Sequence, residues 1–594
     1  MIYLARVFFI LLLSLAPSLA FGATYYIDYS SGADSNNGTS TSTPWQHCPG
    51  DSAATGTAHS ATFSPGDKVI FKGGQSYSVP SGGYITLSWG GSSGSPIVYD
   101  GDSGTYVSRW GSGTSQAVIT GNNNAAAIFL AVAGKNYITI NNLELRSVTA
   151  SSESSIINSA QIAANYFTIT NCTIHDAGSG ANINTAIGFA INASGSNWTV
   201  QGNSFYDCYH ACIYLNSGFS NNTISNNTFG DKSGWAIALA EGGNSDDDGN
   251  SIHNNTFYNI GSYYNLGSPH CNDIIMWVQG SSGASDSGSL TNLSVYNNYF
   301  YESSPTTGTG TITLQINDSG GSSSELANNV FIYNNISANE GRNSFCNISA
   351  SQGNINNLYI YGNSGWTSGG SSAFIQLITN STGSFNAVYI KNNSWSGNSY
   401  IIQTDQLINN PYIDYNNWNT TFGNYFSWKD VGENWSQWQA LGFDTHGYGP
   451  TSDPKYTNIT TSPYNLMPQA GSPLIDHGVT LGSPYNVDYL GTSRPQGSAY
   501  DIGAYESVFS ALPALQKPCL QSSMLTITAS AGTNGSILPL GPVSVCPGNY
   551  KTFTITPQSG YTASVGGTCG GSLVGTTYTT NPITAACTVS ATFQ

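Results

Sequence analysis

A short pattern recurs ten times between Leu143 and Asn416, and it constrains the fold of this chain more than any other feature. Each copy has an apolar residue, two further residues, a central residue that is usually Asn, one residue, and then usually an apolar or aromatic side chain. The clearest copies centre on Asn227, Asn255, Asn298 and Asn393, and the weaker ones on Leu143, Cys172, Asn203, Asn335, Asn363 and Asn416. Neighbouring centres lie 23 to 43 residues apart, a period typical of stacked, quasi-one-dimensional folds.

Apolar residues alternate with polar ones on both sides of each centre, with a slip in phase between the two halves. This indicates two strands that meet at a sharp corner. Asn tolerates a left-handed corner better than other residues with a side chain, and strand layers about 4.8 Å apart let corner Asn side chains bond to one another. The sequence therefore predicts an all-β parallel β-helix of about ten or more coils. Its structural ladder comprises Asn203, Asn227, Asn255, Asn298, Asn335, Asn363, Asn393 and Asn416.

Charged residues make up only 8% of the chain, and the formal net charge is −17. The sequence has no basic patch that would contact phosphates, so nucleic acid and anionic membranes are excluded as partners. A strongly anionic polymer is also a poor ligand unless calcium mediates the contact.

Residues 1–20 resemble a signal peptide, with Arg6 before an apolar run from Val7 to Leu15, so we expect an exported protein. No later segment is apolar enough to predict a transmembrane helix. Ten Cys in an exported chain suggest disulfides. Cys208 and Cys212 are close enough in sequence to close a small loop, whereas Cys172 takes the place of a corner Asn and is expected to be a buried thiol. Cys271 and Cys346 are expected two coils apart, too far to bridge.

Shifts in pattern along the chain predict six regions. They are a signal peptide (1–20), an N-terminal cap with the first coils (21–124), the regular helix (125–419), a C-terminal cap of the helix (420–507), a linker (508–524) and a small β domain (525–594).

The segments around these regions resemble a known superfamily. The opening Tyr25-Tyr-Ile-Asp-Tyr-Ser-Ser-Gly-Ala-Asp, Thr43-Pro-Trp45 and Pro65-Gly-Asp-Lys-Val-Ile-Phe71 are similar to the entry of secreted right-handed parallel β-helix proteins of the pectin-lyase-like superfamily. The ending Asp501-Ile-Gly-Ala-Tyr-Glu506 resembles a bacterial β-helix segment that is often followed by an anchoring tail. This resemblance implies a right-handed helix and export. It does not imply an activity, because the superfold carries lyases, hydrolases, epimerases, adhesins and inert scaffolds.

The last seventy residues are similar to a small repeat domain of bacterial surface proteins, through Gly535-Ser-Ile, Phe553-Thr-Ile-Thr-Pro557 and Cys569-Gly-Gly. In that pattern the residues that match Cys569 and Cys587 pair, which leaves Cys519 to pair with Cys546.

An acidic column is the first candidate site. Four residues past successive ladder centres come Asp176, Asp207, Asp231, Asn259 and Glu302, preceded by His175, Tyr206, Gly230, Tyr258 and Tyr301. Stacked carboxylates repel one another unless a cation or N–H groups satisfy them. The column therefore predicts a substrate-binding groove formed by Asp176, Asp207, Asp231, Tyr206, Tyr258 and Tyr301, assisted by calcium. The alternative is that each acid only accepts hydrogen bonds at its own turn.

A second cluster supplies the catalytic candidates His210, Lys232, Glu241, His270 and Asp273, on the same coils. In a lyase acting on uronates, His210, His270 or Lys232 would be the base. In a hydrolase, Asp207, Asp231, Glu241 and Asp273 would supply the carboxylates. The alternative is a set of polar turn residues on an exposed face.

The run Asp246-Asp247-Asp248 is a candidate calcium site, with a solvated turn as the alternative. The sequence thus leaves three functions open. The first is an enzyme acting on an extracellular polysaccharide, a lyase before a hydrolase or epimerase. The second is a non-catalytic adhesin or matrix protein that binds a polysaccharide or cell-surface glycan. The third is a passive stalk for the C-terminal domain. The oligomeric state does not follow from the sequence.

Overall fold

The computed structural model describes residues 22–111, 115–149, 154–178, 188–216, 218–231, 234–242, 246–260, 272–279, 288–302, 310–316, 326–339, 344–351, 353–369, 373–379, 383–398, 400–405, 408–421, 423, 425–507 and 524–594. The expected signal peptide lies outside these residues. Among them, no helix has both the length and the apolar character needed to cross a membrane.

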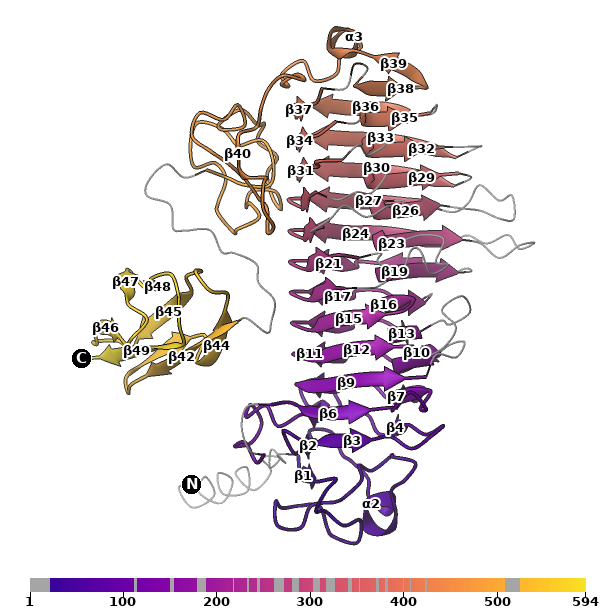
Figure 1. Ribbon diagram of the computed structural model, residues 1–594, viewed down its shortest axis with the longest axis vertical. Coiled ribbons are helices and arrows are strands. Elements are labelled where there is room, and N and C mark those ends of the chain that lie inside the picture. Colours follow the sequence, from indigo (N-terminus) through magenta and orange to yellow (C-terminus); the bar gives the residue numbers. More distant parts are fainter. Residues whose placement is uncertain are drawn as a thin grey trace, which may run out of the picture.

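Three long parallel sheets form the body of the protein (Figure 1). Sheet 1 contains β1 (Thr24–Ile27), β2 (Lys68–Phe71), β5 (Ile97–Asp100), β8 (Ile138–Asn141), β11 (Phe167–Thr170), β14 (Thr199–Gln201), β17 (Thr223–Ser225), β21 (Ser251–His253), β24 (Ser289–Tyr296), β27 (Leu326–Tyr333), β30 (Asn354–Tyr361), β33 (Ser384–Lys391) and β36 (Ile408–Asp414), with β20 (Asp246–Asp248) also paired to β24.

Sheet 2 follows sheet 1 in each coil. It contains β3 (Ser76–Ser78), β6 (Ala117–Thr120), β9 (Leu143–Val148), β12 (Thr173–Ala177), β15 (Ser204–Cys208), β18 (Thr228–Gly230), β22 (Thr256–Tyr258), β25 (Tyr299–Tyr301), β28 (Ile336–Ala338), β31 (Ser364–Trp366), β34 (Ser394–Ser396) and β37 (Asn417–Asn419).

Sheet 3 completes each coil. It contains β4 (Ile85–Leu87), β7 (Ala127–Ala131), β10 (Ser154–Ala163), β13 (Gly188–Ser194), β16 (Ala211–Asn216), β19 (Trp235–Gly242), β23 (Asn272–Gln279), β26 (Gly310–Ile316), β29 (Ser344–Ala350), β32 (Ala373–Ile378), β35 (Tyr400–Thr404) and β38 (Phe426–Trp428), and ends with the antiparallel strand β39 (Val431–Glu433). Each strand pairs with strands one coil away, so the chain forms the right-handed parallel β-helix that the sequence predicts.

The Asn ladder occupies the corner between sheets 1 and 2. From Asn203 to Asn416, the side-chain Nδ2 of each ladder residue donates to the Oδ1 of the next one, over 2.9–3.0 Å. The same Nδ2 also donates to a carbonyl of sheet 1 one coil back, as Asn203 does to Ile169 over 2.9 Å. These side chains are buried, and the ladder satisfies their polar groups away from solvent.

The left-handed corner residue is not the ladder residue, contrary to the expectation from sequence. It is the residue before it, as in Asn226 (φ 55°), Asn254 (φ 56°) and Asn297 (φ 52°). The repeated Asn-Asn pair therefore divides two tasks. The first Asn adopts the backbone conformation that other side chains resist, and the second makes the ladder.

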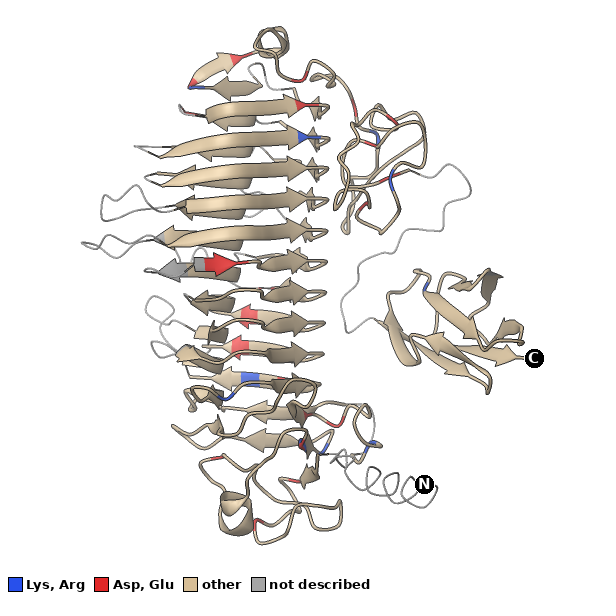
Figure 2. Cartoon of the chain, turned by 180° about the vertical axis from the view of Figure 1, so that it is seen from behind, with Lys and Arg blue, Asp and Glu red and all other residues tan. Residues whose placement is uncertain are grey.

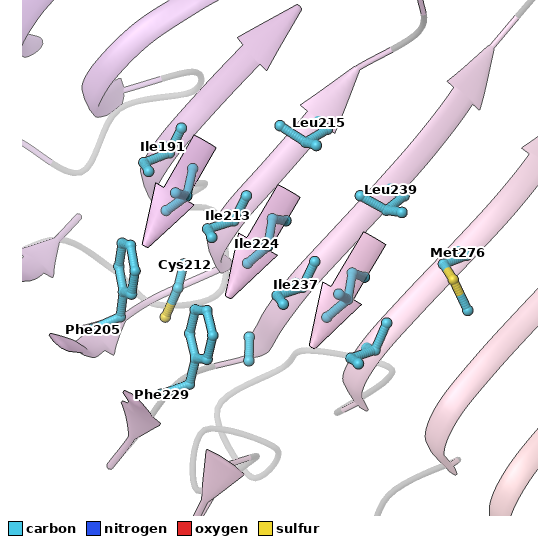
Figure 3. Packing of buried hydrophobic residues seen from close by; sticks show 14 of the residues in the cluster. Ile191, Phe205, Cys212, Ile213, Leu215, Ile224, Phe229, Ile237, Leu239 and Met276 are labelled. Carbon is cyan, nitrogen blue, oxygen red and sulfur yellow. The ribbon is translucent and has the colours of Figure 1, made fainter. Parts of the chain in front are cut away.

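The core consists of like residues stacked in rows along the helix axis. Figure 3 shows Phe205 and Phe229 in one row, and Ile213 and Ile237 in another. The rings of Phe205, Phe229, Phe257 and Phe300 stack with centroids 5.0, 5.0 and 4.6 Å apart. Strand spacing sets these distances, because each coil places its side chain directly above that of the previous one.

The C-terminal end of the stack is covered by aromatic side chains. Helix α3 (Trp435–Ala440) brings Trp438 against Phe426, with ring centroids 4.0 Å apart. Trp428 and Phe443 pack around the same indole. At the other end, the short helix α2 (Gly56–Ser60) belongs to the first coils.

Residues 444–507, here called the side lobe, begin at the end of the stack with Asp444 and then fold back along its outside (Figure 1). The side lobe contains β40 (Tyr456–Asn458) and β41 (Asn465–Pro468). It is held by hydrogen bonds from Tyr299 Oη to the Tyr464 carbonyl (2.8 Å) and from Asn334 Nδ2 to the Val487 carbonyl (2.7 Å). The segment expected only as an end cap therefore also covers the corner between sheets 1 and 2.

The C-terminal residues form a separate core between two four-stranded sheets. The strands are β42 (Leu525–Ala531), β43 (Gly535–Leu538), β44 (Gly541–Val545), β45 (Thr552–Pro557), β46 (Ala563–Gly566), β47 (Gly571–Val574), β48 (Thr577–Thr580) and β49 (Cys587–Phe593). Cys569 and Cys587 form a disulfide, the pair that the resemblance implies. Cys546 is also disulfide-bonded, and Cys519 lies outside the described residues.

Candidate functional site

A row of outward side chains on sheet 2 contains several of the candidate binding residues. Strand register aligns Arg146, His175, Tyr206, Gly230, Tyr258 and Tyr301 on six successive strands. The His175 and Tyr206 rings stack at 4.4 Å, and those of Tyr258 and Tyr301 at 5.8 Å. The Tyr258 ring lies over Gly230, where any Cβ would overlap it. The three tyrosines therefore share one face of the helix, where Tyr301 also packs against the side lobe.

Charged groups cluster at the N-terminal end of this row. His175 Nδ1 lies 2.9 Å from Asp176 Oδ2, and its Nε2 lies 3.4 Å from Glu144 Oε1. Arg146 Nη1 lies 3.0 Å from the same Glu144 oxygen. Burial lowers the pKa of His175, but the hydrogen bonds to Asp176 and Glu144 outweigh it and raise the pKa above its usual value. The bond from His175 in turn lowers the pKa of Glu144.

The acidic column lies at the C-terminal ends of the sheet 2 strands, where the chain bends toward sheet 3, with Asp176 in β12 and Asp207 in β15. Asp176, Asp207 and Asp231 have left-handed backbone angles of 54°, 50° and 37°, and Asn259 has 50°. Asp and Asn adopt this conformation more readily than other side chains. The turn therefore explains these residue types without a ligand. Asn259 Nδ2 also donates to Asp231 Oδ1 over 3.3 Å, which partly relieves the repulsion expected within the column.

An aromatic cluster on the outer face of sheet 3 surrounds His210. Its ring lies 4.5 Å from that of Trp235 and 5.2 Å from that of Phe189, both edge-on. Trp235 in turn lies 5.4 Å from Trp277, which lies 6.0 Å from Tyr214. Phe189 is buried, whereas Tyr214, Trp235 and Trp277 are half-buried. We call these five residues the sheet 3 aromatic cluster.

The turn that carries His210 is cross-linked. Cys208 and Cys212 form a disulfide with their Cα atoms 5.2 Å apart. Backbone bonds from His210 N to the Gly188 carbonyl (3.0 Å) and from Trp235 N to the His210 carbonyl (2.8 Å) join the turn to the coils on either side. Burial lowers the pKa of His210 to about 4, so the imidazole is neutral at pH 7 and weakly basic.

The remaining catalytic candidates do not assemble around His210 in the described part of the protein. Lys232 and His270 lie outside the described residues, as does the side chain of Glu241 in β19. Asp273 in β23 is only 1% exposed, so its carboxylate does not lie on the open face.

Strand β20 separates the candidate calcium ligands. Neighbouring residues of a strand point to opposite faces, and Asp247 is fully buried whereas Asp248 is exposed. Asp248 Oδ1 accepts hydrogen bonds from Thr291 Oγ1 and Asn292 Nδ2, both over 2.7 Å, which lower its pKa. The side chain of Asp246 lies outside the described part. Within that part, no group of three or more His, Cys, Asp or Glu is placed to hold a metal ion.

Sequence reasoning missed Glu144, Arg146 and the aromatic members of the sheet 3 cluster. Arg146 stands three residues past the centre Leu143, the offset at which His175 and Tyr206 follow their own centres, so the repeat itself could have identified it. Trp235 and Trp277 have no such signal. Figure 2 shows how few charged residues lie along the stacked strands, which makes the Arg146–Glu144–His175–Asp176 cluster distinctive.

No protein-family model matches the chain, and no curated protein matches it. Solved structures to which the chain is similar include pectate lyase Pel9A, with 14% identity and a TM-score of 0.40 over 83% of this chain and 98% of that one. Another is XylC in complex with xylose, with 12% identity and a TM-score of 0.46 over 82% and 98%. A third is a lacto-N-biosidase from Eubacterium ramulus, with 11% identity and a TM-score of 0.30 over 66% and 67%. The fold follows from the strand pairing of the chain itself, and these similarities add no argument about activity.

Proposed function

We propose that this protein is exported and binds an extracellular polysaccharide or cell-surface glycan across the outer faces of sheets 2 and 3. The sheet 3 aromatic cluster is the observation that carries this proposal. Single exposed apolar residues are common on protein surfaces, whereas a contiguous patch marks an interaction site. The half-buried rings of Tyr214, Trp235 and Trp277 form such a patch. Sugar rings are suited to them, because one face of a pyranose is apolar and stacks on an aromatic ring.

Polar groups next to the cluster support a sugar ligand. Asn216 Nδ2 donates to Asn192 Oδ1 over 3.2 Å, and strand register aligns Asn192 with Tyr214. Asn192 is buried, so the half-buried Asn216 is the carboxamide of this pair that can reach a ligand. Its N–H donors and carbonyl oxygen suit vicinal hydroxyl groups. The net charge of −17 favours a neutral polymer over an anionic one.

His210 supports binding more than proton abstraction. An efficient general base has a pKa near the working pH, whereas burial among aromatic rings gives His210 a pKa of about 4. A lyase using His210, and a hydrolase using the carboxylates of the acidic column, are therefore the second candidates. The non-catalytic adhesin is the first.

One screen separates these candidates. The mature protein, residues 21–594, is incubated with neutral and uronate polysaccharides with and without calcium, while absorbance from new C=C bonds, reducing ends and retention in polysaccharide gels are followed. Retention without either product is the expected result. Absorbance that disappears in His210→Ala would identify a lyase instead, and reducing ends without absorbance would identify a hydrolase. Silence in all three measurements would contradict the proposal.

A further inference from the structure

The outer face of sheet 1 from β27 to β36 carries two rows of aligned side chains. Strand register aligns Asn328, Asn356, Asn386 and Asn409 in one row. The second row, three residues further along each strand, consists of Phe331, Tyr359, Tyr389 and Tyr412. Both rows lie on a different side of the helix from the sheet 3 aromatic cluster, and they play no part in the function proposed above.

Hydrogen bonds link the amide row from coil to coil. Asn386 Nδ2 donates to Asn356 Oδ1 over 2.9 Å, and Asn409 Nδ2 donates to Asn386 Oδ1 over 2.8 Å. A neighbouring chain of amides continues toward the N-terminus, from Asn357 to Asn329 (3.1 Å) and from Asn329 to Asn292 (2.9 Å). Unlike the ladder at the corner, these amides are half-buried or exposed.

The rings of the second row stack on one another. Phe331 and Tyr359 have centroids 5.0 Å apart at an interplanar angle of 10°, and Tyr359 and Tyr389 are 5.0 Å apart at 6°. Phe331, Tyr359 and Tyr389 are half-buried, and they pack against a cluster that includes Tyr485 and Leu481 of the side lobe. Tyr412, at the end of the row, is 48% exposed. The face is therefore a regular array of amides and aromatic rings that repeats once per strand.

Charge is nearly absent from this face. The four strands β27, β30, β33 and β36 contain only two charged residues, Lys391 and Asp414, both at the strand ends next to the corner. Lys391 Nζ lies 4.0 Å from the centroid of the Tyr412 ring, so its charge is already directed to an aromatic partner. A ligand of this face gains little from carrying charge of either sign.

We propose that Asn356, Asn386, Asn409, Tyr359, Tyr389 and Tyr412, here called the amide–tyrosine face, form a second glycan-binding surface. Its ligand is an extended, neutral polysaccharide lying along the helix axis. A surface that repeats every coil is complementary to a ligand that repeats, and a neutral glycan presents hydroxyl groups that both donate and accept at a regular interval.

The donor and acceptor inventory of the row supports this assignment. Each carboxamide has two N–H donors and two lone pairs on its oxygen. The bond to Asn386 uses one N–H of Asn409, and no protein partner for its second N–H or its oxygen is found among the described residues. The oxygens of Asn356 and Asn386 each accept one bond within the row and keep a second lone pair. The row can therefore hold its own geometry and still bind hydroxyls.

The test compares two double variants in gels that contain hydroxyethyl cellulose, xyloglucan or galactomannan, with polygalacturonate as the anionic polymer. Tyr389→Ala/Tyr412→Ala removes the outer rings of the amide–tyrosine face, and Trp235→Ala/Trp277→Ala removes those of sheet 3. Tyr84→Ala, which removes a ring that is 36% exposed near the N-terminal coils, is the matched control. Asn409→Ala tests the amide row separately, and thermal unfolding establishes that each variant is folded.

We expect Tyr389→Ala/Tyr412→Ala to weaken retention on at least one neutral polymer about tenfold or more, equivalent to about 1.4 kcal/mol, with unchanged behaviour on polygalacturonate. Asn409→Ala should weaken it in the same polymer by a smaller factor. If Tyr389→Ala/Tyr412→Ala were retained as strongly as Tyr84→Ala on every neutral polymer, the inference would be overturned. If only Trp235→Ala/Trp277→Ala lost retention, sheet 3 would be the glycan-binding surface and the amide–tyrosine face would not. If only the tyrosine variant lost retention, the amide–tyrosine face would bind the glycan and sheet 3 would not.

Discussion

Asn416 donates from its Nδ2 to Oδ1 of Asp444 over 2.8 Å, and this bond ends the Asn ladder on a buried carboxylate. The other oxygen, Oδ2, accepts the indole N–H groups of Trp418 (2.8 Å) and Trp438 (2.9 Å). Asp444 therefore joins the last rung of the ladder to the aromatic side chains that cover the end of the stack.

Replacing this carboxylate should destabilise the end of the helix. Asp444→Leu removes the acceptor of the Asn416 backbone N–H and of two buried indole N–H groups, at about 1–3 kcal/mol each, so we expect a loss of several kcal/mol in all. Asp444→Asn keeps one acceptor oxygen and should cost less. Chemical denaturation measures both, with the exposed Asp430→Asn as the control. Equal stability of Asp444→Leu and Asp430→Asn would contradict this role.

The same residue should contribute to the pH dependence of stability. Burial raises the pKa of Asp444 to about 6, whereas an unfolded Asp titrates near 3.9. The folded state therefore binds this proton more tightly, so stability should decrease as the pH rises from about 4 to about 6, by up to about 3 kcal/mol. Denaturation of wild type and Asp444→Leu across this window isolates the contribution. A difference in unfolding free energy between them that is constant with pH would contradict the prediction.

His175 of sheet 2 should affect the pH dependence of stability at a higher pH than Asp444 does. Because its folded pKa is raised above the usual value, His175 should stabilise the protein fully below about pH 6.5, and this stabilisation should be lost as the pH rises through the folded pKa. At pH 5.5, His175→Asn should cost about 1–3 kcal/mol through the lost charge-assisted hydrogen bonds, and less at pH 9. The exposed His59→Asn is the control. A cost that grows with pH would exclude this explanation.

Much of the fold could be predicted from the sequence because Asn recurs at the same position of every coil from Asn203 to Asn416. The rungs from Asn203 to Asn416 were all identified in this way, but their partner Asp444 was not, since it follows Asn416 by 28 residues as an Asp. The side lobe gave no local signal either. Its contact between Tyr299 and Tyr464 joins residues 165 positions apart.

The candidate site was less predictable for a related reason. Outward positions are not confined by the close-packed interior of the helix, so their residue types change from coil to coil. The row of sheet 3 that contains Tyr214 continues as Ala238, Ile275 and Thr313. The inward row beside it, Ile213, Ile237, Ile274 and Ile312, is constant because the core allows little variation. The backbone task of the first Asn in each Asn-Asn pair was likewise hidden, because both positions carry the same side chain.

That division of tasks can be tested at Asn254 and Asn255. Asn254 adopts a φ of 56° and is exposed. Asn254→Ala should therefore lower the free energy of unfolding by about 1–2 kcal/mol, and Asn254→Gly should leave it almost unchanged, because Gly adopts this conformation without strain. Asn255→Ala should cost more than either, because Asn255 Nδ2 bonds both Asn298 (3.0 Å) and the Ile224 carbonyl (2.9 Å). Equilibrium unfolding would rank the three variants. If Asn255→Ala were the mildest, the ladder would not have the structural role described above.

The Cys208–Cys212 and Cys569–Cys587 disulfides should differ in their effect on stability. The disulfide that closes the short loop between Cys208 and Cys212 should stabilise the folded state by about 2 kcal/mol, because it restricts the unfolded chain. The one that closes the longer loop between Cys569 and Cys587 should contribute about 3 kcal/mol. Calorimetry of Cys208→Ser/Cys212→Ser should show a modest shift in the unfolding of the β-helix. Cys569→Ser/Cys587→Ser should shift the C-terminal domain further. Because the first disulfide also holds the turn of His210, its removal should weaken glycan retention, whereas loss of the second should not. The reverse pattern of retention would place the binding surface elsewhere.

Glycan binding by the aromatic cluster is the central claim, and quantitative affinity electrophoresis of wild type, Trp235→Ala/Trp277→Ala and Tyr84→Ala tests it most directly. We expect wild type and Tyr84→Ala to be retained equally by at least one neutral polysaccharide, with retention by that polymer at least about tenfold weaker in the tryptophan variant. Equal retention of all three proteins, with the tryptophan variant folded, would contradict the claim.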